Sequence, residues 1–236
     1  KSGWTPVQQL QAIFKTVPAL YKQRDKVISL LESRLRSCNI CRLTVDELDN
    51  REKKKVERWF RDQIQPVLSP LVLDLHHPFP HLPNKRLTLA FSLQQNGRDT
   101  FGLLPLPAGI PPFLQLEEQG VRYILLEDVL LYYAGEIFDQ FTISCSAVVS
   151  VTRNADISPE DEAYDIDEDF RQHMRKIVKK RSRLAPVRLE IQGEQCDKLV
   201  AFLCEKLSIS REQVFFTKSP ISLGYVYALE GLLPPE

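Results

Sequence analysis

Three of the four histidines of this 236-residue chain, His76, His77 and His81, lie close together in a proline-rich passage. Histidine carries acid–base chemistry, phosphate transfer and metal binding near neutral pH. Each of these roles needs a partner, and no serine, cysteine or carboxylate stands at a motif-like spacing around the three. Because proline fixes φ and favours extended geometry before it, the passage is better interpreted as a rigid turn leading into a strand.

Cys38 and Cys41 form a C-x-x-C motif at the end of a predicted helix. A thioredoxin-type dithiol would stand between a strand and the start of a helix, and a structural zinc would need two more ligands at a familiar spacing. We therefore interpret the pair as free thiols near a domain junction. The five cysteines, an odd number, likewise predict thiols of a reducing compartment rather than a disulfide framework.

A long charged helix is predicted over residues 158–183, acidic in its first half and basic in its second. This order complements the helix dipole, so a solvated and well-capped helix explains it. A basic half that faces a polyanion is the alternative. Asp161, Asp165 and Asp169 share one face of this helix and are a minor candidate for Mg²⁺.

The composition is that of an ordinary globular protein, with 43% hydrophobic and 26% charged residues. The sequence contains neither an apolar run of roughly 18 residues nor a recognisable signal peptide. The net charge of zero argues against nucleic acid as a partner. Phosphate-loop, dinucleotide, nucleophile-elbow and HExxH motifs are absent from the sequence. We expect a cytoplasmic chain that is inactive by itself, with peripheral membrane association left open.

Thr5 and Pro6 form a good helix start, and apolar residues recur at helical spacing from Val7 to Leu35. Pro18 is expected to kink this helix or to mark a restart. One helix cannot bury such a stripe against itself, so we expect it to belong to a helical bundle. Its partner helices are expected upstream of Lys1, in a chain that is a truncated part of a longer one.

Strand patterns dominate the remainder, and Asn96-Gly97 is a strong hairpin signal. The predicted strands are 87–93, 100–104, 121–126, 142–152, 187–191 and 214–217, with a short extended piece at 39–43. The further predicted helices are 49–65, 127–138, 195–207 and 220–229. This order predicts an α+β fold, in which a helical segment precedes a two-layer α/β sandwich with a mainly antiparallel sheet.

Several short strings resemble, in order, those of bacterial polyphosphate kinases. They are Glu57-Arg58-Trp59-Phe60, Pro66-Val67-Leu68-Ser69-Pro70-Leu71, His77-Pro78-Phe79-Pro80, Tyr123-Ile124-Leu125-Leu126-Glu127-Asp128, Val151-Thr152-Arg153-Asn154-Ala155-Asp156 and Val187-Arg188-Leu189-Glu190. The resemblance implies that residues 1–38 close the family's amino-terminal helical domain. It implies that residues 39–236 are the middle, or head, domain.

The resemblance implies a parent enzyme that transfers the terminal phosphate of ATP to polyphosphate through a phosphohistidine, with Mg²⁺. In the family that histidine lies in carboxyl-terminal domains that this chain does not match. We therefore assign no catalytic, cofactor-binding or metal-binding residue, including His173, and expect no ATP or Mg²⁺ on this segment. The roles that carry over are assembly, as a homodimer or homotetramer, and flanking of the polyphosphate path.

Arg153 is the first candidate for a structural or anion-facing role, because it ends a predicted strand before a polar turn. Pairing with Asp156 or capping of backbone carbonyls is the alternative. Lys85 and Arg86 are further candidates for the polyphosphate path. A rival interpretation is a non-enzymatic module whose first helix binds a partner helix. A nucleic-acid binder using the basic residues 176–183 is a second rival, which the net charge disfavours.

Overall fold

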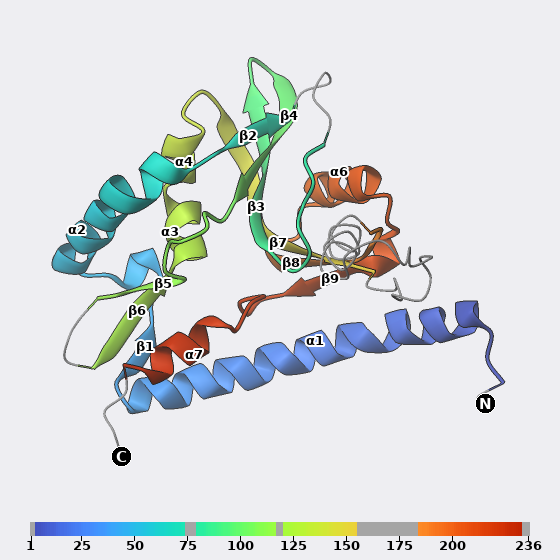
Figure 1. Cartoon of the computed structure of the whole chain (residues 1–236), viewed down its shortest axis with the longest axis horizontal. Coiled ribbons are helices and arrows are strands. Elements are labelled where there is room, and N and C mark those ends of the chain that lie inside the picture. Colours follow the sequence, from blue (N-terminus) through green and yellow to red (C-terminus); the bar gives the residue numbers. More distant parts are fainter. Residues whose placement is uncertain (1–2, 74–78, 117–119, 155–183, 233–236) are drawn as a thin grey trace, which may run out of the picture.

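The computed structural model describes residues 3–73, 79–116, 120–154 and 184–232. Its first element is the long helix α1 (Pro6–Ser37), and two β-sheets with shorter helices follow (Figure 1). The remaining elements are β1 (Ile40–Arg42), α2 (Asn50–Trp59), β2 (Leu71–Leu73), β3 (Leu87–Gln95), β4 (Arg98–Pro105), β5 (Phe113–Gln115), β6 (Val121–Leu125), α3 (Leu126–Tyr132), α4 (Ala134–Ile137), β7 (Thr142–Arg153), β8 (Pro186–Gly193), α6 (Asp197–Leu207), β9 (Val214–Thr217) and α7 (Tyr225–Glu230). The predicted α+β class is confirmed.

Some sequence-based candidates lie outside the described residues. These are His76, His77, His173 and the predicted charged helix over 158–183 with its three aspartates.

The larger sheet has six strands in the order β2-β4-β3-β7-β8-β9. Its pairs are antiparallel except β8–β9, which is parallel because α6 provides the crossover between these two strands. The β3–β4 hairpin turns at Asn96 and Gly97, whose φ angles of 51° and 76° match the left-handed geometry that tight hairpins need. The mainly antiparallel sheet is thus confirmed.

A second sheet of three strands, in the order β1-β6-β5, was not predicted as a separate unit. β1 pairs with β6 in parallel, and β5 pairs with β6 in antiparallel. Strands β1 and β5 have three residues each, too few to show a period-two pattern in the sequence. The predicted helix over 127–138 is also divided, because α3 ends at Tyr132 and α4 begins at Ala134.

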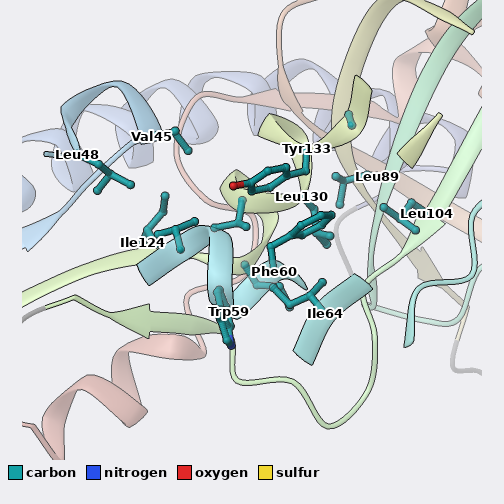
Figure 2. Close-up of a cluster of buried hydrophobic side chains, with 14 of the residues drawn as sticks. Val45, Leu48, Trp59, Phe60, Ile64, Leu89, Leu104, Ile124, Leu130 and Tyr133 are labelled. Atoms are coloured by element: carbon teal, nitrogen blue, oxygen red, sulfur yellow. The ribbon is translucent and has the colours of Figure 1, made fainter. Parts of the chain in front are cut away.

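The six-stranded sheet is covered on both faces, as the alternation along β3 requires. Leu89 and Phe91 of β3 join a core with α2, α3 and the π-helical turn over Phe60–Ile64, while Ala90 joins the core under α6. Figure 2 shows the first core, where Phe60 stacks on Tyr133 with ring centroids 4.0 Å apart. These apolar faces fix the sheet between two layers of helices.

Helix α1 begins with the predicted cap, in which Thr5 and Gln8 exchange hydrogen bonds of 2.9 and 3.3 Å. The helix continues through Pro18 without interruption, so the predicted restart is wrong. Pro18 is exposed, and water can satisfy the carbonyl that loses its helical donor.

The prediction that all five cysteines are thiols is also wrong. Cys145 of β7 and Cys196, just before α6, form a disulfide across 51 residues of sequence. Packing of α6 on the sheet brings the two together, and no short-range spacing signals this pairing. Cys38, Cys41 and Cys204 are free thiols.

Three residues of α1 attach it to the edge of the six-stranded sheet, and we call these contacts the α1 seam. Tyr21 stacks on Phe215 of β9, with ring centroids 5.4 Å apart. The Arg24 guanidinium donates to the carbonyls of Pro220 and Ile221. The Asp25 carboxylate accepts four hydrogen bonds of 2.7 to 3.0 Å from residues 217–219.

Replacing Asp25 by alanine is expected to weaken the α1 seam. Two hydroxyls and two backbone N–H groups lose their charged acceptor, which should lower the free energy of unfolding by about 2–3 kcal/mol. Urea unfolding measures this loss. Lys26→Ala on the next, exposed position of α1 is the matched control and should have little effect. Equal losses in both variants would contradict the assignment.

Candidate anion-facing site at the end of strand β7

Arg153 is the last residue of β7, and its side chain is directed to backbone carbonyls. Its Nε donates to the Leu82 carbonyl at 2.9 Å, and its Nη1 donates to the Leu184 carbonyl at 2.8 Å. Arg153 is only 9% exposed, and burial lowers the pKa of its guanidinium. The capping alternative is therefore what the structure describes, whereas pairing with Asp156 lies outside the described residues.

Lys85 and Arg86 are exposed on the segment that Arg153 holds. The backbone N–H of Lys85 donates to the Val151 carbonyl at 2.8 Å, and Asn84 forms an isolated bridge with Val151. The Asn84 side chain also accepts from the backbone N–H of Arg153 at 2.9 Å. Lys85 has a φ of 57°, a conformation that persists only where surrounding contacts hold it. The end of β7 thus fixes the backbone that carries both exposed cations.

Arg188 of β8 is a fourth cation near this strand end, and the sequence reasoning missed it as a site residue. Its Nε and Nη2 donate to the Thr152 hydroxyl at 3.2 and 3.0 Å, and Nη2 lies 3.2 Å from the Glu190 carboxylate. Its side chain is 36% exposed. The signal available in the sequence was the polar alternation of Arg188, Glu190 and Gln192 within an otherwise apolar strand.

Glu190 connects this strand end to the α1 seam. Besides contacting Arg188, the Glu190 carboxylate accepts a 2.6 Å hydrogen bond from the Tyr21 hydroxyl. Burial and the neighbouring Glu190 carboxylate raise the pKa of Tyr21. A polar chain therefore runs from Tyr21 through Glu190 and Arg188 to Thr152, the neighbour of Arg153.

A second polar cluster lies where α1, β1 and α3 meet. Arg42 donates to Glu32 at 2.6 Å and lies 3.4 Å from the Asp128 carboxylate. Next to them, Glu127 is only 3% exposed, and burial raises its pKa to about 7. Burial also raises the pKa of Asp128. Arg42 thus pairs with Glu32 and Asp128, while Glu127 has no ion pair with it among the described contacts, and burial favours the neutral form of Glu127.

The described residues also form a surface pocket of about 460 Å³ between α2 and α3. Lys53, Lys54 and Tyr132 line it, together with Tyr133, whose ring is labelled in Figure 2. The pocket is separate from the predicted cations, and sequence reasoning did not point to it. Among the described residues, no group of three or more histidine, cysteine or acidic side chains is placed to hold a metal ion.

The family model described as the polyphosphate kinase middle domain matches residues 51–229. The chain belongs to the polyphosphate kinase family. It is 33% identical over 245 residues to a polyphosphate kinase of Bacillus cereus, covering 100% of this chain and 34% of that relative. It is 30% identical over 230 residues to one of Campylobacter jejuni, covering 96% of this chain and 32% of that relative.

A solved structure, that of polyphosphate kinase from Porphyromonas gingivalis, has the same fold, with a TM-score of 0.73 at 21% identity. The match covers 96% of this chain and 32% of that one. This polyphosphate kinase segment spans about a third of the length of the curated relatives it matches. In its described part, no helix has the length and apolar character needed to cross a membrane.

Replacing Arg153 by alanine is expected to destabilise the fold. The carbonyls of Leu82 and Leu184 lose their donors in a buried setting, which should lower the free energy of unfolding by about 2–3 kcal/mol. Chemical denaturation measures the change. Arg86→Ala removes an exposed cation from the same region and should leave stability nearly unchanged. A stable Arg153→Ala variant would refute the capping role.

Glu127 makes the stability depend on pH. Its pKa is raised from the ordinary 4.5 to about 7, so the folded state holds this proton more tightly than the unfolded chain does. The resulting stabilisation is complete below about pH 4.5 and is lost as pH rises through about 7. Glu127→Gln should remove this dependence and raise stability at pH 8 by on the order of 3 kcal/mol. Thermal or urea unfolding at several pH values tests this.

The exposed carboxylate Glu212 provides the control for this pH series. Glu212→Gln should keep the pH profile of the parent chain. A Glu127→Gln variant with the parent profile would show that the buried carboxyl does not control it.

Proposed function

We propose that this chain is a non-catalytic segment of an enzyme that transfers the terminal phosphate of ATP to polyphosphate through a phosphohistidine. The match of residues 51–229 to the middle domain of polyphosphate kinases carries this proposal. In such a reaction Mg²⁺ and ATP supply the phosphoryl chemistry. We assign neither group to this segment, and among its described residues no three histidine, cysteine or acidic side chains gather as a metal site would require. We expect the segment alone to be inactive.

The segment's own role in this proposal is to support and flank the polyphosphate path. Lys85 and Arg86 are exposed, and their backbone is fixed by Asn84 and by the end of β7. Cations held on a rigid backbone bind a polyanion with little loss of conformational freedom, and such binding weakens as salt rises. Arg153 acts here as the residue that positions the two exposed cations.

Assembly into a homodimer or homotetramer is the second part of the proposal, together with a cytoplasmic location that leaves peripheral membrane association open. Exposed apolar side chains on α1 and α7 support assembly, because such side chains are costly to leave in water. They are Val7, Leu10, Ile13, Leu20, Val27, Leu30, Leu31 and Leu35 on α1, and Val226 and Tyr227 on α7.

A non-enzymatic interaction module remains the alternative, because the same α1 residues could receive a partner helix. Size-exclusion chromatography over a range of chain concentrations separates the two. Self-association that disappears in Leu30→Glu supports assembly of this chain with itself. A monomer at all concentrations would remove the assembly proposal and favour a different partner.

Lys85→Ala combined with Arg86→Ala is expected to weaken binding of the chain to long-chain polyphosphate by about tenfold. It should also reduce the slope of log affinity against log salt by about one for each cation removed. Titration at several salt concentrations gives both numbers. Arg98→Ala removes an exposed cation at the start of β4; it is the matched control and should change neither.

The same titrations with RNA as ligand test specificity. Equal affinity for RNA and polyphosphate would remove the proposed path. An equal loss in the Arg98 control would show that only the net charge matters.

A further inference from the structure

The disulfide between Cys145 and Cys196 joins an irregular part of strand β7 to the start of helix α6. Cys145 lies next to an irregularity in the pairing of β7 with β3, where the register shifts between Ser92 and Leu93. Cys196 is the residue that caps the start of α6. Both cysteines are partly exposed, so a small thiol can reach the bond. The bond therefore connects the bulged part of a strand to the first turn of a helix.

Helix α6 has anchors that do not depend on this bond. Leu199, Val200 and Leu203 are at most 2% exposed in the core beneath the helix. The ring of Phe202 stacks on Phe101 with centroids 3.7 Å apart. Lys198 forms an ion pair with Asp99 at the start of β4. Opening of the disulfide should consequently leave the helix docked and affect mainly its first turn.

Each sulfur also has an alternative interaction when the bond is open. Cys196 caps α6 without a side-chain hydrogen bond to the helix, whose first N–H groups favour a thiolate at this position. Ser92 lies opposite Cys145 in the β3–β7 register, so the two side chains share a face of the sheet. The buried Ser92 hydroxyl has no hydrogen-bond partner in the described part of the chain. A Cys145 thiol would give it one.

We propose that Cys145 and Cys196 are a reversible redox-modification site that exchanges with low-molecular-weight thiols and disulfides such as glutathione. The Cys196 thiolate attacks the small disulfide, forms a mixed disulfide and releases one small thiolate. The Cys145 thiolate then attacks the Cys196 sulfur and releases the second small thiolate. The two protein thiols give up two protons and two electrons, and the small disulfide becomes two thiols. This proposal does not depend on the proposed function.

Differential alkylation followed by peptide mass spectrometry tests the site on the whole chain, in buffers of set ratios of reduced to oxidised glutathione. Cys145 and Cys196 should change together from fully alkylated to fully bonded across these ratios. Cys38, Cys41 and Cys204, which are free thiols, should appear only as alkylated thiols or as mixed disulfides with glutathione, and never in an intramolecular bond. Amide exchange over residues 197–200 should speed about tenfold on reduction, while the rest of α6 stays protected.

Variants separate this site from a merely structural bond. Cys145→Ser and Cys196→Ser should each show fast amide hydrogen exchange over residues 197–200 in every buffer, because neither can form the bond. Cys204→Ser should respond to the glutathione ratio like the parent chain. Continued alkylation of the pair in all oxidising buffers would overturn the proposal. So would a bond that resists glutathione until the chain is denatured, or loss of protection throughout α6.

Ser92→Ala tests the proposed partner of the Cys145 thiol. Removing the hydroxyl should destabilise the reduced form. The chain should then need a ratio of reduced to oxidised glutathione about threefold higher before half of the Cys145–Cys196 bonds are open. An unchanged ratio would overturn the role of Ser92, and a shift in the opposite direction would show that the hydroxyl stabilises the bonded form instead.

Discussion

The carboxylate of Asp25 accepts hydrogen bonds from two hydroxyls and two backbone N–H groups at the end of β9 and just after it, and the position of α1 depends on these contacts. Burial disfavours the charge, but these hydrogen bonds outweigh burial and lower the pKa of Asp25 to about 2. The carboxylate therefore stays charged at any ordinary pH. Much of the apolar surface of α1 faces water, so burial alone would hold this helix weakly. Directed polar contacts supply the attachment and also fix its register.

The α1 seam and the strand end that carries the exposed cations belong to one contiguous structure. Tyr21 bonds to Glu190, Glu190 pairs with Arg188, and Arg188 donates to Thr152 beside Arg153. Every step is a short polar contact between partly or fully buried groups, where the local dielectric is low and geometry is strongly restricted. Displacement of α1 would remove the Tyr21 donor from Glu190. Such a network connects the α1 seam physically to the end of β7. Energetic coupling between the two places would require, in addition, an element that can adopt two conformations.

Sequence reasoning succeeded where short-range patterns carry the structure. Alternation over 87–93 and the Asn96-Gly97 pair predicted the β3–β4 hairpin, since a half-buried strand and a tight turn both impose local residue preferences. It missed Arg188, the Cys145–Cys196 bond and the Asp25 contacts, because each depends on residues far apart in the chain. Arg153 was found as a candidate only from its place at a strand end. Its actual partners are the carbonyls of Leu82 and Leu184, which are far away in the chain and cannot be predicted from the local sequence.

The burial of Arg153 makes it a poor direct ligand for a polyanion. Its Nε and Nη1 already donate to carbonyls, and a phosphate could recruit those donors only by leaving the carbonyls unsatisfied. Such an exchange costs about as much as the new charged contact would provide. Lys85 and Arg86 carry no such cost, because both are exposed on a backbone that is already fixed. We infer that Arg153 acts through position, and that direct contact with an anion falls to the two exposed cations.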